Sequence, residues 1–181
     1  MIAKMHLAMD KCEIVLPKRG KDCFVDKYIG ILNEKKSPAA LDFAVIGASL
    51  WAEAEKLPTG FCHMDMHRGN VIKVGAGSCI IDFDTSCTAF PAYDVAVFCD
   101  CTNYFSLKAG EKEATERELE RFLNGYTRIR TLEKMETDSV YKLIALRHFQ
   151  LQAIIIERFG LDSVDEGFFS SQLRWLDEFL S

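Results

Sequence analysis

The sequence has 181 residues, of which 49% are hydrophobic and 27% charged, and its formal net charge at pH 7 is -5. These proportions are typical of a globular protein in water, and a single domain over residues 1–181 accounts for the length. The acidic balance excludes a nucleic-acid-binding protein that relies on a basic face. We therefore expect no nucleic acid as a partner. No apolar run reaches the ~18 residues of a membrane-spanning helix, so we also expect no membrane as a partner.

The seven cysteines form no C-x-x-C pair, so a zinc site built from paired thiolates is not expected. Reduced thiols that act as small hydrophobic side chains are typical of the cytoplasm. We therefore predict a cytoplasmic protein.

The first third of the chain is predicted to be mostly helical. A short helix is expected over residues 1–10, and another over about 24–35. Between them lies the basic stretch "LPKRGKD" (residues 16–22), which we interpret as a solvated loop and not as a phosphate site.

A longer helix is predicted to follow. Ser37 and Pro38 supply its N-cap and first-turn proline, and the helix is expected to reach about Lys56. Apolar residues at helical spacing define one predicted apolar face: Leu41, Val45, Ala48 and Trp51.

Extended segments dominate the middle of the chain. "GFCH" (60–63) is short and extended, and "NVIKV" (70–74) and "SCIIDF" (78–83) have the composition of strands. "GAG" (75–77) lies between the last two segments. We therefore predict a β-hairpin.

The downstream half is predicted to be helical again. In residues 114–129 and 166–181, apolar residues recur at helical spacing, first as Leu119, Phe122, Leu123 and Tyr126 and then as Phe169, Leu173, Leu176 and Leu180. The segment 139–160 is apolar on most sides, so it is expected to be a central buried helix ended by Gly160. Together these segments predict a mostly helical α+β protein with an inserted hairpin.

The hairpin brings carboxylates together. If it is symmetric about its "GAG" turn, Val74 faces Ser78 and, counting back, Asn70 faces Asp82. Opposed residues lie about 5 Å apart at Cβ, so an amide oxygen and a carboxylate can reach one Mg²⁺ ion. Asp65 lies five residues before Asn70, on the loop that enters the first strand. Two metal ligands beside a carboxylate that can orient a nucleophile are the parts that phosphoryl transfer needs.

The same residues carry a resemblance to a known family. "HMDMHRGN" (63–70) fits the H-x-D-x-x-x-x-N catalytic loop of protein-kinase-like enzymes, and "IIDFD" (80–84) fits their metal-binding segment. With "AYDVAVF" (92–98), the region resembles the aminoglycoside phosphotransferase and choline kinase family of small-molecule kinases. The resemblance departs from the family at Met64, where glycine is preferred, and at Arg68, where proline is frequent.

This resemblance implies a kinase that uses Mg²⁺ and ATP, or GTP, to phosphorylate a hydroxyl of a small molecule. It implies Asp65 as the catalytic aspartate, Asn70 and Asp82 as Mg²⁺ ligands, and His63 as a brace for the loop. Three further residues are expected to contact substrate or to support the site: Asp84, His67 and Asp94. The acidic site would suit a cationic amino-alcohol or amino-sugar.

The resemblance also implies that residues 1–181 form the C-terminal lobe of a kinase-like fold. A phosphate-covering loop and a strand lysine, which belong to the N-terminal lobe, are not found in the sequence. We expect the chain to be incomplete without that lobe. An absent lobe would leave an apolar face that could drive self-association or pairing with the lobe.

Two alternatives remain open from the sequence. His63, Asp65 and His67 form H-x-D-x-H, which could hold zinc or manganese in a metal-dependent hydrolase. Alternatively, the chain is a truncated kinase lobe that folds without catalytic activity.

Overall fold

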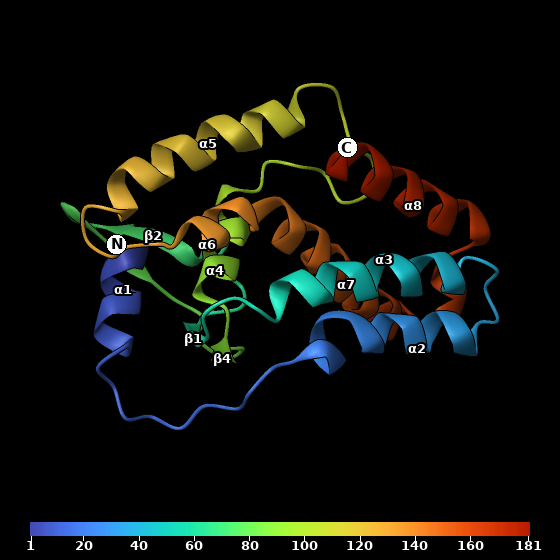
Figure 1. Ribbon diagram of the computed structural model, residues 1–181, viewed down its shortest axis with the longest axis horizontal. Helices are drawn as coiled ribbons and strands as arrows, with labels where there is room; N and C mark the ends of the chain where they lie inside the picture. The colour runs from blue at the N-terminus through green and yellow to red at the C-terminus, as the bar shows by residue number, and fades with distance from the viewer.

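Helices make up most of the molecule (Figure 1). The computed structural model describes all residues 1–181. The helices are α1 (Ile2–Met9), α2 (Lys27–Glu34), α3 (Ala40–Ala54), α4 (Pro91–Cys99), α5 (Glu111–Tyr126), α6 (Lys134–Asp138), α7 (Val140–Phe159) and α8 (Glu166–Leu180). The strands are β1 (Gly60–Cys62), β2 (Val71–Val74), β3 (Gly77–Ile80) and β4 (Cys87–Ala89). None of the helices is both long and apolar enough to cross a lipid bilayer.

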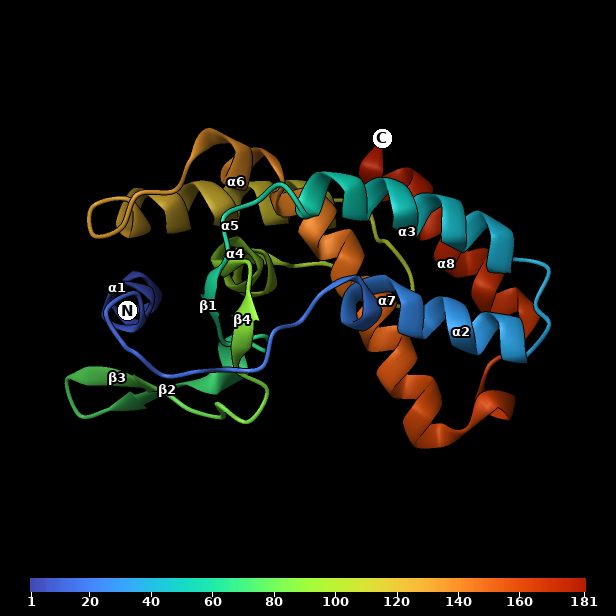
Figure 2. The ribbon, with the colours of Figure 1, turned by 60° about the horizontal axis from the view of Figure 1, so that its bottom comes forward.

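The predicted central helix is confirmed as α7. It packs against α2, α3, α4 and α8 and is buried along most of its length. It ends at Gly160, whose φ of 90° favours glycine. Figures 1 and 2 show α1 and the two small sheets at one end of the molecule and α2, α3 and α8 at the other. The β2–β3 hairpin is largely exposed at this end, whereas β1 and β4 contribute Cys62, Cys87 and Ala89 to the buried core.

The predicted apolar face of α3 is wrong. Leu41 and Val45 are 72% and 63% exposed, and the buried residues of this helix are Phe43, Gly47, Leu50 and Ala54. Gly47 lies at a close helix contact, because a Cβ there would come within 2.6 Å of Val25 Cγ1 and 2.9 Å of the Phe149 ring. Apolar residues occur on several sides of α3, so spacing alone does not identify the buried one.

The hairpin forms, but its predicted register is wrong by one residue. Val74 pairs with Gly77 and Val71 with Ile80, so only Gly75 and Ala76 form the loop. Gly75 has a φ of 56°, and two-residue hairpin loops require such a residue at the first loop position. Asn70 therefore pairs with Ile81, whose N–H donates to the Asn70 carbonyl at 3.0 Å.

A second small sheet was not predicted. β1 pairs antiparallel with β4, with Cys62 opposite Cys87. The basic stretch 16–22 runs along β4 (Figure 2), where Thr88 donates its N–H to the Pro17 carbonyl and accepts from the Arg19 N–H. The side chains of Lys18 and Arg19 are exposed, as expected for this stretch, but its backbone is held by the sheet.

Candidate functional site

The segment from His63 to Asn70 joins β1 to β2 and is held by one buried carboxylate. Asp94, in the first turn of α4, is fully buried. Its side chain accepts the N–H groups of His63 at 2.7 Å and Met64 at 3.0 Å. The same carboxylate also accepts from the Cys62 thiol at 3.2 Å and from His6 Nε2 at 2.9 Å. Asp94 therefore connects α1, β1, α4 and the start of this loop.

His63 connects this loop to the segment after β3. Its buried ring donates from Nε2 to the Ile81 carbonyl at 2.9 Å and lies 4.8 Å from the Phe83 ring. The Thr85 hydroxyl donates to the His63 carbonyl at 3.0 Å. The two segments that carry the predicted site residues are thus joined at both the side chain and the backbone of His63.

Met64 adopts a left-handed backbone conformation, with a φ of 70°. Such a conformation favours glycine, and most other side chains meet steric strain in it. This geometry gives a physical reason for the glycine that the family prefers at this position. The Met64 side chain is nonetheless buried in the core.

The loop presents Asp65 beside a cavity. The Asp65 side chain is 36% exposed, and its Oδ1 accepts from Arg147 Nη2 at 2.9 Å. Its other oxygen lies 3.4 Å from His67 Nε2. The cavity has a volume of about 370 Å³, and Asp65 forms part of its wall. The carboxylate is therefore oriented by protein groups and still reachable by a small molecule.

Arg147 of α7 was not identified from the sequence. It is almost fully buried, and it also donates to the Met64 carbonyl at 3.4 Å and to the Tyr104 hydroxyl at 3.1 Å. Burial lowers the pKa of Arg147, but Tyr93, Tyr104 and Asp65 raise it by more, so it lies above the ordinary value. The sequence did contain a signal for this residue, because Arg147 lies within a helix that is apolar on most sides. A cation buried in such a helix needs polar partners.

Asn70 and Asp82 both lie at the base of the hairpin, just before β2 and shortly after β3. The Asn70 side chain is buried and donates from Nδ2 to the Asp65 carbonyl at 2.9 Å. Its amide oxygen makes no hydrogen bond within the protein and could therefore bind a metal ion. Asp82 directly follows Ile81, the residue that pairs with Asn70, and it has a φ of 64°. Asp82 and Asp84 are both exposed. An amide oxygen and a carboxylate without internal partners fit Mg²⁺, which prefers oxygen ligands.

The H-x-D-x-H residues do not form a metal site. No three His, Cys, Asp or Glu side chains converge on a point that could hold a metal ion. The His63 ring already donates to Ile81, and His67 Nδ1 accepts from the Gly69 N–H at 2.9 Å. The geometry therefore gives no support to the hydrolase alternative.

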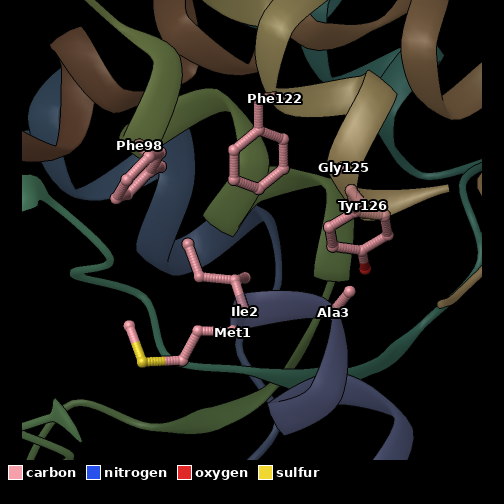
Figure 3. Close-up of a pocket in the computed structure, with 7 residues that line it drawn as sticks. All are labelled: Met1, Ile2, Ala3, Phe98, Phe122, Gly125 and Tyr126. Atoms are coloured by element: carbon pink, nitrogen blue, oxygen red, sulfur yellow. The ribbon is translucent and has the colours of Figure 1, made fainter. Parts of the chain in front are cut away.

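A second cavity, of about 290 Å³, lies between α1, α4 and α5 (Figure 3). Figure 3 shows the rings of Phe98, Phe122 and Tyr126 facing the first residues of α1. The cavity is lined mostly by hydrophobic residues and contains none of the predicted site residues. It offers no group for phosphoryl transfer.

Known proteins that resemble this chain in sequence are phosphotransferases. Residues 30–136 match the model of the phosphotransferase enzyme family, APH. A homoserine kinase of Rhodopseudomonas palustris (strain BisA53) is 36% identical over 148 residues, which is 77% of this chain and 43% of that protein.

The fold also matches a solved structure, that of the amicoumacin kinase hAmiN in complex with AMP-PNP, Ca²⁺ and Ami. The TM-score is 0.68 at 16% identity, over 98% of this chain and 55% of the kinase. The chain thus spans about half the length of these relatives. Its helical α+β fold is that of about half of such a kinase, and the chain belongs to the phosphotransferase enzyme family.

Proposed function

We propose that this chain is the catalytic, acceptor-binding lobe of a small-molecule kinase, which transfers the γ-phosphoryl group of ATP, or of GTP, to a hydroxyl. One observation carries the proposal. Asp65 is fixed by a buried arginine, yet its carboxylate forms part of the wall of a cavity of small-molecule size.

Asp65 would accept or align the proton of the attacking hydroxyl. Arg147 holds one carboxylate oxygen, which leaves the second oxygen, beside His67, for the acceptor. Asp94 and His63 act by fixing the loop, because Asp94 binds the backbone N–H groups at its start and His63 Nε2 binds the Ile81 carbonyl. A fixed carboxylate can position a hydroxyl without the cost of reorganising at the moment of reaction.

Asn70 and Asp82 are proposed to hold Mg²⁺, and Asp84 to support the ion or the phosphates. When bound, the ion would neutralise charge on the transferred phosphoryl group. The hydrogen bond from Asn70 Nδ2 to the Asp65 carbonyl would fix the orientation of the amide, so that its oxygen is the atom left to bind the ion.

We also propose that turnover needs groups beyond these 181 residues. Kinase-like enzymes cover the nucleotide phosphates with a glycine-rich loop and pair them with a strand lysine. These residues span 43% of the homoserine kinase and 55% of the amicoumacin kinase. An N-terminal lobe, supplied in the same or a second polypeptide, is therefore the expected partner.

The test separates nucleotide binding from turnover. In calorimetric titrations we expect ATP to bind only with Mg²⁺ present, and we expect Asp82→Asn to abolish this binding. We then expect transfer of radioactive phosphate from ATP to homoserine, the first acceptor to try, only after the N-terminal half of the homoserine kinase relative is added. Asp65→Asn should stop transfer while its circular dichroism stays that of the parent chain. The proposal would be contradicted if the affinity for ATP were the same with and without Mg²⁺ and were unchanged in Asp82→Asn.

A further inference from the structure

The cavity beside Asp65 is rich in positive charge. Its charged lining residues are Arg19, Lys27, Arg147 and Asp65, so three cations face one carboxylate. This local balance is opposite to that of the whole chain, whose net charge is -5. Leu151 and Ile154 of α7 supply an apolar part of the wall. At about 370 Å³, the cavity lies near the lower end of the volumes usual for small-molecule sites.

Two of the three cations already have carboxylate partners. Arg147 is paired with Asp65 at 2.9 Å, and Lys27 with Glu157 at 2.7 Å. The Arg19 guanidinium takes part in none of the ion pairs of the protein. Arg19 is therefore the cation of this cavity whose charge is not yet balanced.

The backbone at Arg19 is fixed. Its N–H donates to the Thr88 carbonyl at 3.1 Å, and the Thr88 N–H donates to the Pro17 carbonyl at 2.9 Å. The side chain thus extends from a position held by β4, while its guanidinium keeps its five donors. A planar donor set on a fixed backbone suits a carboxylate, which it can bind through two hydrogen bonds.

The proposed metal ligands do not share this cavity, because neither Asn70 nor Asp82 contributes to its wall. The positive charge of the cavity therefore surrounds Asp65, the residue proposed to receive the acceptor, and the proposed ligands Asn70 and Asp82 are not among its lining residues. This also reverses the expectation of a cationic acceptor, since Arg19 and Lys27 would repel one.

We propose that the acceptor carries a carboxylate a few bonds from its hydroxyl, and that Arg19 binds this carboxylate while Asp65 receives the hydroxyl. The inference rests on the proposed kinase function. It narrows the substrate class to small hydroxy acids and hydroxy amino acids and assigns the basic stretch 16–22 a part in specificity.

The test measures binding of the acceptor alone, without nucleotide. A negative result would then contradict this inference without contradicting the proposed kinase function. The probes are L-homoserine and its primary amide, which differ in the carboxylate, and choline as a purely cationic alcohol. Ligand-observed NMR titration should show L-homoserine binding roughly tenfold more tightly than its amide, with choline weaker still.

Variants locate the effect. Arg19→Gln should remove the difference between L-homoserine and its amide, and Arg19→Lys should retain part of it. Lys18→Gln is the matched control, because it removes the same charge from the adjacent residue, which is not part of the cavity wall. It should change neither affinity.

Equal binding of the acid and the amide, preferential binding of choline, absence of binding by L-homoserine, or an Arg19→Gln variant that behaves as the parent would each overturn the inference. Phosphorylation of choline or of the amide by the enzyme completed with its N-terminal lobe would overturn it too, and would leave the kinase function standing.

Discussion

The two segments that carry the site differ in how the protein holds them. From His63 to Asn70, four of the side chains are buried, and the N–H groups of His63 and Met64 are bound by Asp94. From Ile81 to Thr85, the residues are exposed, and the side chains of Asp82 and Asp84 make no ion pair or hydrogen bond within the protein. The first segment is fixed by the fold itself, whereas the second keeps its carboxylates free.

This difference matches the two proposed tasks. A residue that aligns a hydroxyl must be oriented before the substrate arrives. Metal-binding carboxylates must instead keep their oxygens free for the ion. We therefore expect substitutions in the first segment to alter the stability of the protein. In the second segment, we expect substitutions that keep the backbone conformation to alter ligand binding with little effect on stability.

The largest effect is expected at Asp94. Asp94→Ala would leave the N–H groups of His63 and Met64 and the ring of His6 without their buried acceptor. Loss of one member of a buried charged network typically costs about 3–5 kcal/mol. Urea unfolding of the variant should show this loss. A change below about 1 kcal/mol would mean that Asp94 does not hold the loop.

Acid should lower the stability of the folded protein through His148, the buried residue that follows Arg147 on α7. Burial lowers the pKa of His148 to about 3, so the folded protein keeps it neutral while the unfolded chain binds a proton below about pH 6.5. The unfolded state then holds more protons, and stability falls as the pH drops from 6.5 toward 3. Between pH 6.5 and pH 4 this contribution amounts to about 3 kcal/mol.

The control for this prediction is His148→Gln, measured by urea unfolding at both pH values. Burial raises the pKa of Asp100 and Glu136, and these groups add stability on acidification, the opposite sign. Since both are present in parent and variant, the difference between the two proteins isolates His148. Parallel losses in the two proteins would refute its role.

Two left-handed residues give a smaller and matched test. Met64→Gly removes backbone strain of about 1–2 kcal/mol but also a buried side chain worth about 2–5 kcal/mol, so we expect a net loss of about 2 kcal/mol. Asp82→Gly has the same backbone benefit and no packing to lose, since Asp82 is exposed. Thermal denaturation should therefore show opposite shifts in melting temperature. Shifts of the same sign would show that the burial of Met64 and the exposure of Asp82 do not decide how glycine affects stability at these positions.

The smallest effect on stability is expected for Asp82→Asn. The residue is exposed, and asparagine tolerates a φ of 64°, so unfolding should change by less than about 0.5 kcal/mol. Calorimetry should nevertheless show loss of Mg²⁺-dependent ATP binding. A destabilised variant would mean that the Asp82 carboxylate has a structural partner and is not free, unlike the second segment as described above.

The parts of the fold that the sequence predicted are those with long, consistent spacing. The segment 139–160 had only one plausible structure, since it is apolar on most sides and ends in glycine, and it forms α7. β4 escaped prediction because three residues carry little local signal and their partner, β1, is distant in sequence. The buried side of α3 is set by the approach of Val25 and Phe149 to Gly47, a tertiary contact that spacing does not reveal.

The residues of the candidate site were easier to find than their geometry. The H-x-D-x-x-x-x-N pattern located Asp65 and Asn70, but the facing of Asn70 and Asp82 was wrong because "GAG" allows loops of two or three residues. Arg147 and Arg19 were missed for a different reason. Each lies in a part of the chain far from the motif, so only the folded chain shows that both line the cavity beside Asp65.

Asp94 also has a consequence for the order of folding. Its carboxylate joins His6, 88 residues earlier, to His63, 31 residues earlier. Contacts over such separations form only after long loops have closed, which makes them slow to appear. We therefore expect the loop around Asp65 to gain its geometry in one of the last steps of folding, when α1 docks. A partly folded chain would have the residues of the site and none of their alignment, so catalytic competence would be a property of the finished fold alone.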